Sequence, residues 1–403
     1  MTTEKDLRRC AAALRTGEAL LICTGAGMGV DSGLGTFRGR NAGVWQPMRT
    51  IGMDYVDICD PDWIEEDARL GWAFWLFCYS AYTTQAPHRG YQILADWGQG
   101  MKHGLFSATS NIDGHWARTR GVGEERVYEC HGAVTHMQCL DGYNGRVWRT
   151  TPEEMALMRI PEWDLQAGEE VEVLEGSIRN RRFRSEEWIR ATVAEDGFGI
   201  LDPDSSNTID VTAVRRPGGE DLVRITEDST LPTDPQTAQP ARPNVLMFGD
   251  MDVCLTRIEA QRSALSSWVD SLPKDTRLVI VEVGAGTTIP TMRRMAENMA
   301  ASFQNSTLIR INLDEHSVPA GLGERAIGVG GMGALEALEK LRGHVGELRN
   351  GGEAGQRGGG GTGEVVEQGA TTGVQPQGEA MDLSELRTAL DSEIEPCHQA
   401  NKL

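Results

Sequence analysis

The chain has 403 residues, with 59 acidic and 39 basic side chains and a formal net charge of −20. Its length predicts two or three folded units. Direct nucleic-acid binding is excluded because neutralising phosphates needs clustered lysines and arginines, whereas a basic, lysine-bearing substrate stays compatible with this charge.

The first residues and the cysteines indicate an intracellular protein. Charges interrupt the opening MTTEKDLRRC, where a signal peptide would need an apolar core, and no stretch approaches the ~18 apolar residues of a membrane span. The eight cysteines include no Cys-x-x-Cys pair, which favours reduced, buried thiols over a disulfide framework. We expect no membrane partner and a cytoplasmic location, with the nucleus as the alternative.

The chain opens with a helix, a strand and a glycine-rich turn. Residues 5–16 carry an apolar stripe at helical spacing, Gly17 stops the helix, and the apolar run 19–24 predicts a strand. The segment 24–39, TGAGMGVDSGLGTFRG, then supplies small residues that let a backbone approach a pyrophosphate. From 45 to 97, aromatic residues and methionines at helical spacing predict a helical insertion.

Strands and helices alternate again later in the chain. The strand-like runs are 104–109, 244–248, 277–283 and 307–312, and the helical segments are 256–271, 290–303 and 333–349. Apolar strands that alternate with helices are typical of a mostly parallel sheet covered on both faces. We therefore expect an α/β fold with a doubly wound, parallel, Rossmann-like sheet, formed by a discontinuous domain of residues 1–150 and 240–343.

Residues 164–228 break this alternation. They contain five short strand-like runs separated by Gly, Asp, Asn and Pro, at 169–174, 187–193, 198–201, 208–211 and 221–225. Such spacing predicts a small all-β barrel insertion, and the pattern GEEVEV…WIRATV…GFGILD…VRRPGG resembles a Tudor-like module. Residues 229–243 read as a linker. Residues 344–403 are glycine-rich and too poor in apolar side chains to offset their ordering entropy, which predicts a disordered tail.

The glycine segment does not fit the fingerprint of a dehydrogenase. A G-x-G-x-x-G motif would need glycine where Val30 stands, and an acidic residue about 20 positions later, where the sequence runs through WQPMRTIG. Hydride transfer is therefore a weak interpretation.

Three further motifs favour a different interpretation of the glycine-rich segment 24–39. They are TSNIDG at 109–114, ECHG at 129–132 and RPNVLMFGD at 242–250, and they follow it in this order. The ordered set resembles the signature of the sirtuins, a family of NAD-dependent protein deacylases. The resemblance covers most of residues 5–342 outside the barrel.

The resemblance implies a role for each matched position. The residues expected to hold NAD are Gly25, Ala26, Gly27, Thr36, Phe37, Arg38, Ser110, Asn111, Ile112, Asp113, Gly284, Ala285, Gly286, Thr287 and Asn312. Two of the implied residues are catalytic: Asn111 orients the ribose, and His131 is the general base, a role suited to a side chain that titrates near neutral pH. The residues expected to bind the acyl-lysine substrate are Val245, Phe248, Gly249 and Asp250.

The implied function is NAD-dependent deacetylation or deacylation of protein lysines, with nicotinamide and O-acyl-ADP-ribose as products. The partner is an acylated protein or peptide, which can pair with the chain as an added strand. One alternative is NAD hydrolysis or ADP-ribosyl transfer on the same fold, because Ser110 stands where the family usually has Gln. Another is an inactive NAD-sensing or reader protein whose barrel binds a partner through Phe183, Trp188 and Phe198.

Two departures from the family pattern carry further expectations. Sirtuins commonly hold a structural zinc with two Cys-x-x-Cys pairs, yet the interval between ECHG and RPNVLMFGD offers only Cys139, so we expect no metal site and propose that the barrel replaces the zinc module. Residues 73–80 lack the arginine that pairs with acidic acyl groups in some sirtuins. Because an unpaired carboxylate in an apolar pocket is costly, acetyl or longer neutral acyl groups are expected.

Overall fold

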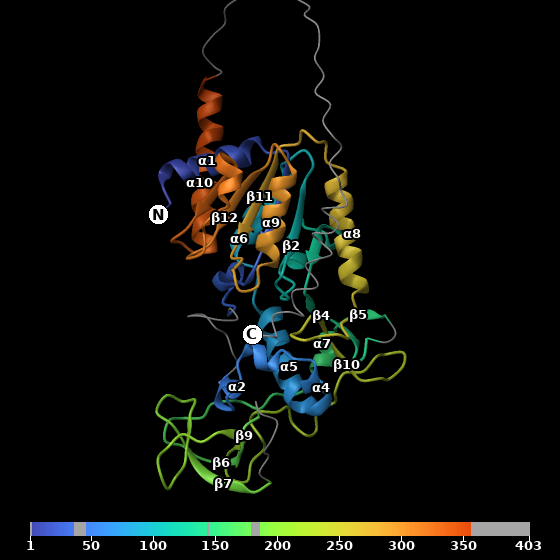
Figure 1. The fold of residues 1–403 in the computed structure, drawn as a ribbon. Coiled ribbons are helices and arrows are strands. Elements are labelled where there is room, and N and C mark those ends of the chain that lie inside the picture. The colour runs from blue at the N-terminus through green and yellow to red at the C-terminus, as the bar shows by residue number, and fades with distance from the viewer. Residues whose placement is uncertain (1, 36–45, 143–144, 179–185, 356–403) are drawn as a thin grey trace, which may run out of the picture.

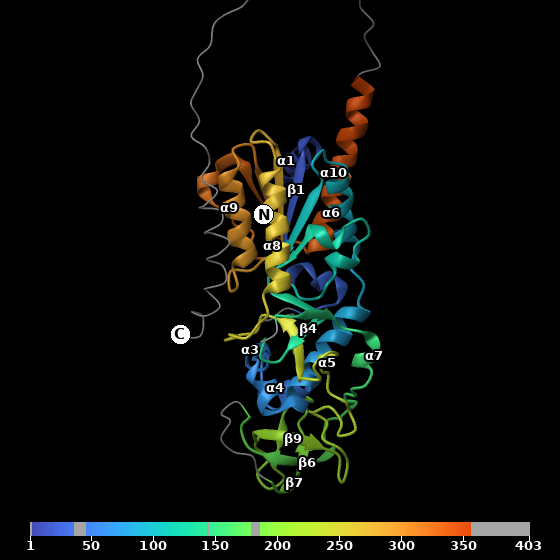
Figure 2. The same cartoon turned by 90° about the vertical axis from the view of Figure 1, so that its right-hand side faces the viewer.

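The computed structural model describes residues 2–35, 46–142, 145–178 and 186–355. The described chain forms three layers along one long axis. A large sheet with its helices lies at one end, several helices and a small sheet lie in the middle, and a second small sheet lies at the other end (Figure 1). The same order is visible after a quarter turn (Figure 2).

The large sheet is wholly parallel. Its strands are β1 (Ala19–Thr24), β2 (Leu105–Thr109), β3 (Val127–Glu129), β11 (Leu278–Val283), β12 (Thr307–Ile311) and β13 (Ala326–Val329). They are arranged in the order β13-β12-β11-β1-β2-β3, with every neighbouring pair parallel. The chain starts at the centre, builds outward through β2 and β3, and returns to the other side of β1. The prediction of a doubly wound parallel sheet is confirmed.

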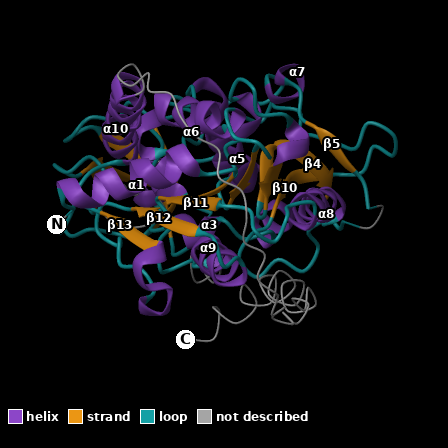
Figure 3. Cartoon of the chain, turned by 90° about the horizontal axis from the view of Figure 1, so that it is seen from above, coloured by secondary structure: helices purple, strands orange, loops and turns teal. Residues whose placement is uncertain are grey.

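Helices bury both faces of this sheet. Alternate residues of β1 point to opposite faces, so Leu20 and Ile22 pack with α1 (Glu4–Thr16), α6 (Arg89–Gln99) and α10 (Ala334–Gly355). Leu21 and Cys23 pack instead with α8 (Thr256–Asp270) and α9 (Thr291–Ser302). Seen from above, α1, α6 and α10 lie on one side of the sheet and α9 on the other (Figure 3). Burial on both faces explains why β1 is a continuous apolar run.

The middle layer combines helices with an antiparallel sheet. Its helices are α2 (Gln46–Thr50), α3 (Tyr55–Ile58), α4 (Asp62–Glu66), α5 (Ala68–Thr84) and α7 (Pro152–Met155). Its strands are β4 (Gly132–Cys139), β5 (Val147–Arg149) and β10 (Ala241–Val245), in the order β10-β4-β5. The helix α5 carries most of the aromatic core, with Trp72, Phe74 and Trp75 almost fully buried.

The far end is an antiparallel sheet that we call the β-module (residues 164–228). Its strands are β6 (Glu170–Glu175), β7 (Trp188–Val193), β8 (Ile200–Leu201) and β9 (Val211–Arg215), in the order β8-β7-β6-β9. Four of the five expected strand regions thus contain or border a strand. The fifth, 221–225, contributes a single bridge between Asp221 and Arg215.

Short 3-10 turns connect several of these elements. They are η1 (Ala26–Met28), η2 (Val30–Ser32), η3 (Trp116–Arg118), η4 (Glu124–Arg126) and η5 (Ala320–Arg325). None of the helices in the described ranges is both long and apolar enough to cross a membrane.

The structure differs from the sequence-based expectations at three places. The run 244–248 was grouped with the parallel strands, but the strand formed there, β10, pairs antiparallel with β4. The helix α6 falls within the expected helical insertion, 45–97, yet it packs on the parallel sheet through Tyr91 and Leu94. Helix α10 continues to Gly355, into the segment 344–403 expected to be disordered, and the rest of that segment lies outside the described residues.

Candidate active site

The predicted cofactor segments meet at one edge of the parallel sheet. Ligands of such sheets bind outside the carboxyl ends of the strands, where the strand order reverses. Here the reversal falls between β1 and β11, because β2 and β3 are added on one side of β1 and β11 on the other. The loops that follow β1 and β11 are Gly25–Gly27 and Gly284–Thr287, so these two segments lie side by side.

Glycine is required where these two loops touch. The backbone N–H of Gly25 donates to Val283 O, and that of Gly27 donates to Gly284 O, both at 3.0 Å. A Cβ on Gly25 would lie 2.7 Å from the Cα of Ala285. A Cβ on Gly284, whose φ is +66°, would lie 2.4 Å from the carbonyl carbon of Gly27. The loops therefore pack backbone against backbone, which explains their glycines.

The loop after β2 is tied to the first glycine turn. The side-chain amide of Asn111 donates to Gly25 O at 3.0 Å, and its backbone N–H donates to Thr109 Oγ1 at 3.0 Å. The Ser110 backbone N–H donates to Thr24 O at 3.1 Å, and the Ser110 hydroxyl lies 3.5 Å from the same oxygen. Both residues thus hold the β2 loop against the β1 loop.

A small cavity lies between these loops and the end of α5. Its lining residues are Ala26, Gly29, Leu34, Gly35, Tyr82, Asn111, Ile112 and Asp113. Four of the predicted cofactor residues, Ala26 and the Asn-Ile-Asp triplet, therefore share one cavity. Thr36, Phe37 and Arg38 follow directly in the sequence but lie outside the described residues.

Asp113 is a carboxylate in a desolvated position. It is 6% exposed, and its Oδ1 accepts a hydrogen bond from the backbone N–H of His115 at 2.8 Å. Burial raises the pKa of Asp113 to about 6, although this hydrogen bond and the charge of Arg118 act in the opposite direction. The side chain is therefore mainly ionised at pH 7 and can accept a charge-assisted hydrogen bond from an amide N–H.

His131 lies next to the same loops. The backbone N–H of Cys130 donates to Thr109 O at 3.0 Å, which brings the end of β3 against the end of β2. The His131 side chain is half-buried, and burial lowers its pKa to about 4, while the nearby Ser110 backbone acts in the opposite direction. This pKa lies below the near-neutral value expected for a general base. The imidazole is therefore neutral at pH 7, and a neutral imidazole has one ring nitrogen that can accept a proton.

The predicted substrate segment borders His131. The backbone N–H of Leu246 donates to the His131 carbonyl at 3.0 Å, and Val245 pairs with Gly132 at the start of β4. The segment that follows β10 is thereby placed beside the predicted catalytic histidine. The described structure brings together the glycine turn, the Asn-Ile-Asp triplet, His131 and the start of the substrate segment.

The remaining substrate residues differ in what they contact. The backbone N–H of Phe248 donates to Cys59 O at 2.9 Å, and its half-buried ring packs on the apolar cluster of the middle layer. Gly249 is exposed, with φ +72°. Asp250 instead forms a fully buried, two-pronged ion pair with Arg242, in which Nη1 lies 3.0 Å from Oδ1. Because both its oxygens are engaged, we reinterpret Asp250 as a residue that shapes the segment.

The late cofactor loop is braced from β12. The side chain of Asn312 donates to Ala285 O at 3.0 Å and accepts from the backbone N–H of Glu315 at 3.0 Å. Thr287 donates to the Glu315 carboxylate through its backbone N–H at 2.8 Å and through its hydroxyl at 2.6 Å. Asn312 and Thr287 therefore hold the loop in shape, whereas Gly286 is open on the side where a Cβ would meet only Glu315 at 3.4 Å.

Sequence reasoning missed three residues of this site. Tyr82 lines the cavity from α5, and Glu315 supports the late loop. Trp116, in η3, donates its indole N–H to Thr24 Oγ1 at 2.9 Å and so fixes the start of the glycine turn. Glu315 follows Asn312 closely in the sequence and could have been predicted as part of the same motif. Tyr82 is distant in sequence from every motif, so nothing in the pattern pointed to it.

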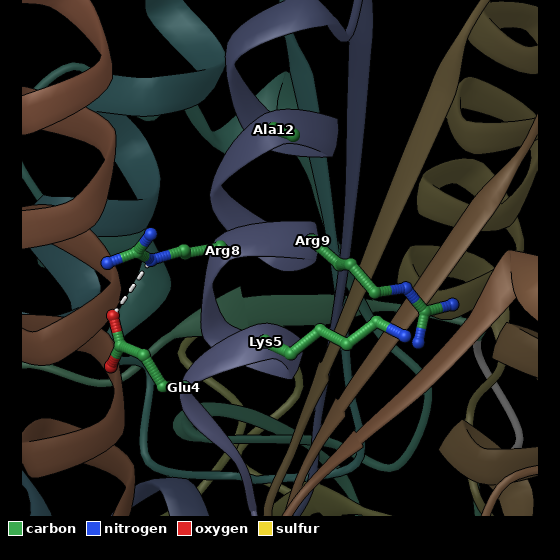
Figure 4. Close-up of a pocket in the computed structure, with 5 residues that line it drawn as sticks. All are labelled: Glu4, Lys5, Arg8, Arg9 and Ala12. Atoms are coloured by element: carbon green, nitrogen blue, oxygen red, sulfur yellow. Dashed lines mark hydrogen bonds and ion pairs between the residues drawn. The ribbon is translucent and has the colours of Figure 1, made fainter.

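A surface hollow on α1 is not a comparable site. It is lined by Glu4, Lys5, Arg8, Arg9 and Ala12 (Figure 4). Arg8 pairs with Glu4 at 3.0 Å, and Arg9 pairs with Glu324 at 2.6 Å. Carboxylates therefore already neutralise two of its basic groups.

Cys139, at the end of β4, has a polar partner of its own. Its thiol donates to Asp234 Oδ2 at 3.2 Å, and Arg146 Nη1 donates to Asp234 Oδ1 at 2.7 Å. No group of three or more His, Cys, Asp or Glu side chains that could hold a metal ion occurs among the residues that the structure describes.

Comparison with known proteins identifies the family. The model of the Sir2 family matches residues 25–264, which is more than half of the chain. This chain belongs to the Sir2 family. The match includes the glycine turn, the Asn-Ile-Asp triplet, His131 and the whole β-module.

Individual relatives of this Sir2-family chain match it over shorter stretches. It is 32% identical over 154 residues to an NAD-dependent protein deacylase of Deinococcus radiodurans, covering 38% of this chain and 60% of the relative. It is also 32% identical over 120 residues to an NAD-dependent protein deacetylase of Oceanobacillus iheyensis, covering 30% and 47%. The chain thus spans about half to three-fifths of the relatives' length. A solved Sir2 enzyme is similar over 86% of this chain and all of its own, at 18% identity and a TM-score of 0.48.

Proposed function

We propose that this Sir2-family chain is an NAD-dependent protein deacylase that removes neutral acyl groups from lysine side chains. One observation carries the proposal: Asn111 and Asp113 line one cavity with Ala26, and His131 follows Cys130, whose backbone N–H donates to Thr109 O at 3.0 Å, at the start of the same loop. The names of the relatives, NAD-dependent protein deacylase and deacetylase, support the same activity.

The residues of the cleft fit a dinucleotide. Two glycine loops pack so closely that a Cβ on either would collide with the other backbone, and they lie at the strand ends, where phosphates bind in sheets of this kind. The cavity beside them presents a carboxylate and an amide, Asp113 and Asn111, suited to the carboxamide and the ribose. The late loop, Gly284–Thr287, and Asn312 would border the other end of the dinucleotide. Thr36, Phe37 and Arg38 keep their predicted roles as cofactor residues.

Asp113, Asn111 and His131 would each have a separate role in the reaction. NAD, when bound, supplies a glycosidic bond whose cleavage drives transfer of the acyl group away from lysine. Asp113 would hold the nicotinamide carboxamide by accepting its N–H, and Asn111, fixed on Gly25 O, would orient the ribose. His131 would accept a proton from a ribose hydroxyl at its unprotonated ring nitrogen, because its low pKa keeps the imidazole neutral at pH 7.

The neutral acyl group is inferred from the surroundings of the substrate segment. Val245 and Met247 belong to the same buried apolar cluster as Phe74, Trp75 and Cys78 of α5. A carboxylate carried by a succinyl-type group would be desolvated there without a partner. Acetyl and longer neutral acyl groups would instead gain from the apolar contact.

The proposal is tested by release of nicotinamide from NAD with and without an acetylated peptide. We expect release that depends on the peptide, together with O-acyl-ADP-ribose detected by mass spectrometry. Release without peptide would favour NAD hydrolysis, and modification of the peptide by ADP-ribose would favour transfer of that group. The variant His131→Ala should lose peptide-dependent release, and an unchanged rate would reject the assigned base.

A further inference from the structure

The β-module forms an ion pair with Asp67, the residue directly before α5. Arg224 donates through Nε and Nη2 to Asp67 Oδ2, at 3.0 and 2.9 Å. The two side chains are only 12% and 9% exposed, so water screens the pair weakly. Asp67 is also the N-cap of α5, because its Oδ1 accepts from the backbone N–H of Leu70 at 3.3 Å. One carboxylate therefore joins the β-module to the start of this helix.

A second contact fixes the same end. The guanidinium of Arg69 donates to Ile225 O through Nε at 2.8 Å and Nη2 at 2.6 Å. In return the backbone N–H of Ile225 donates to Arg69 O at 3.2 Å. Five hydrogen bonds of two residues, at positions 67 and 69, thus hold the first turn of α5 on the segment 224–225.

The apolar core continues from the β-module into the site. One buried cluster contains Val173 and Val193 of the β-module, Trp72 and Phe74 of α5, and Ile112 of the cofactor cavity. A module that folded as a separate unit would have a core of its own. Because packed interiors deform little, a displacement of the β-module would also displace α5 through this shared core.

The other end of α5 reaches the cofactor cavity. Tyr82 lines the cavity together with Asp113, whose charge contributes to raising the pKa of the tyrosine. Arg118 donates to Tyr82 O at 2.6 Å and to Thr83 O at 2.9 Å, which attaches the end of the helix to η3. Between Asp67 and Tyr82 the helix spans about 23 Å, at 1.5 Å per residue. The β-module and the cavity are therefore joined by one continuous helix.

The aromatic side chains of the β-module are already engaged. The ring of Trp188 is covered by Arg215, whose guanidinium carbon lies 3.9 Å from the ring centroid. The ring of Phe198 is covered by Arg49 of α2, at 4.2 Å. Phe183, the third aromatic residue through which a reader protein was expected to bind a partner, lies outside the described residues. The two described rings serve internal contacts, and one of these contacts again joins the β-module to the middle layer.

We propose that the β-module positions Tyr82 in the cofactor cavity through α5, with Asp67, Arg69 and Arg224 as the positioning residues. This proposal rests on the proposed NAD-dependent function of the cavity. Tyr82 lines the cavity from α5, together with Asp113, so its placement sets how tightly the cavity holds NAD and the nicotinamide released from it. The β-module thus acts on the affinity of the site for its cofactor.

The test compares two double variants of the full chain. Asp67→Asn with Arg69→Met loosens the β-module from α5, and asparagine keeps the helix cap because it is as good an N-cap residue as aspartate. Asp221→Asn with Arg159→Met is the matched control: Asp221 is the other carboxylate on Arg224, at 2.7 Å, and Arg159 pairs with Glu220 at 3.0 Å, but neither touches α5. Each pair removes one negative and one positive charge.

The readout is the dissociation constant of NAD, measured by calorimetry on each variant, together with nicotinamide inhibition of peptide deacylation. In the first variant we expect NAD binding and nicotinamide inhibition each to weaken by at least about fivefold. This factor is the lower end of the coupling that is typical between two sites. The NAD affinity and the nicotinamide inhibition of the control variant should stay within about twofold of the wild-type values. This smaller change measures the effect of lost stability alone. Melting temperatures of both variants are measured in the same buffer.

Variants of Tyr82 test whether the β-module changes NAD affinity through this side chain. In a Tyr82→Ala background the first variant should change NAD binding by less than about twofold, because the side chain to be positioned is gone. In Tyr82→Phe, which keeps the ring, the fivefold effect should persist. Equal NAD affinity of test and control variants, or an undiminished effect in Tyr82→Ala, overturns the proposal. A wild-type protein that neither binds NAD nor releases nicotinamide would instead reject the proposed function itself.

Discussion

Protonation of Asp113 should set the lower pH limit of cofactor use. Burial raises its pKa to about 6, so the carboxylate is present above this pH and lost below it. About nine-tenths of the side chains are ionised at pH 7 and about one-tenth at pH 5, by the ordinary titration relation. If only the ionised form binds the nicotinamide carboxamide well, kcat/KM for NAD should fall about tenfold between these pH values.

The assay is the initial rate of peptide-dependent nicotinamide release at limiting NAD, from pH 5 to pH 8, with a neutral acetylated peptide at saturation. His131 should not contribute to the decline, because burial lowers its pKa to about 4, below this range. The variant Asp113→Asn cannot ionise, so its profile should be flat. Its rate at pH 7 should be lower by about 10- to 100-fold, because a charged hydrogen bond contributes roughly 1.5–3 kcal/mol.

A second variant tests the electrostatic origin of the decline. The charge of Arg118 lowers the pKa of Asp113, so Arg118→Met should raise that pKa and move the decline to higher pH. A wild-type profile that is flat from pH 5 to pH 7, or an Asp113→Asn profile that keeps the same decline, would show that the decline does not come from Asp113. A shift of the Arg118→Met profile to lower pH would contradict the assigned cause.

Three further predictions address catalysis, specificity and stability. His131→Ala should reduce deacylation by at least about 100-fold while calorimetry finds NAD affinity within about twofold of the wild type, since a general base contributes mainly to the chemical step. Matched peptides should lose acetyl faster than succinyl groups, and the reverse order would contradict the apolar pocket. Arg146→Met should lower the free energy of unfolding by about 3 kcal/mol in a denaturant titration, because Asp234 would remain buried without its cation; an unchanged midpoint would show that this pair is not needed.

The candidate site was predicted from motifs, and the structure explains why these motifs meet. Gly25, Asn111, His131 and Gly284 each follow a parallel strand, although β3, the strand before His131, was not among the predicted strands. The same reasoning misjudged the ionisation of His131, since burial comes from packing that the sequence does not display.

Other misjudgements have a common physical origin. Asp250 stands in a motif, but its role depends on Arg242, eight residues earlier, folding back to form a buried pair. Tyr82 belongs to no motif and reaches the cavity only because α5 ends there. Side chains of this kind are defined by contacts between distant segments, and a periodicity or a motif reports only the local pattern.

A buried polar cluster around Asp234 joins two segments that are distant in the sequence. Asp234 is fully buried, and it accepts hydrogen bonds from Cys139, from Arg146 at 2.7 Å and from the backbone N–H of Gln236 at 2.8 Å. These contacts join the end of β4 to the segment 229–243, as a metal ion would join separate loops. A guanidinium so close to the carboxylate disfavours a divalent cation at the same oxygens, because like charges repel. Metal analysis of the purified protein should therefore find much less than one zinc per chain, and one tightly held zinc would reject the expectation that this chain has no metal site.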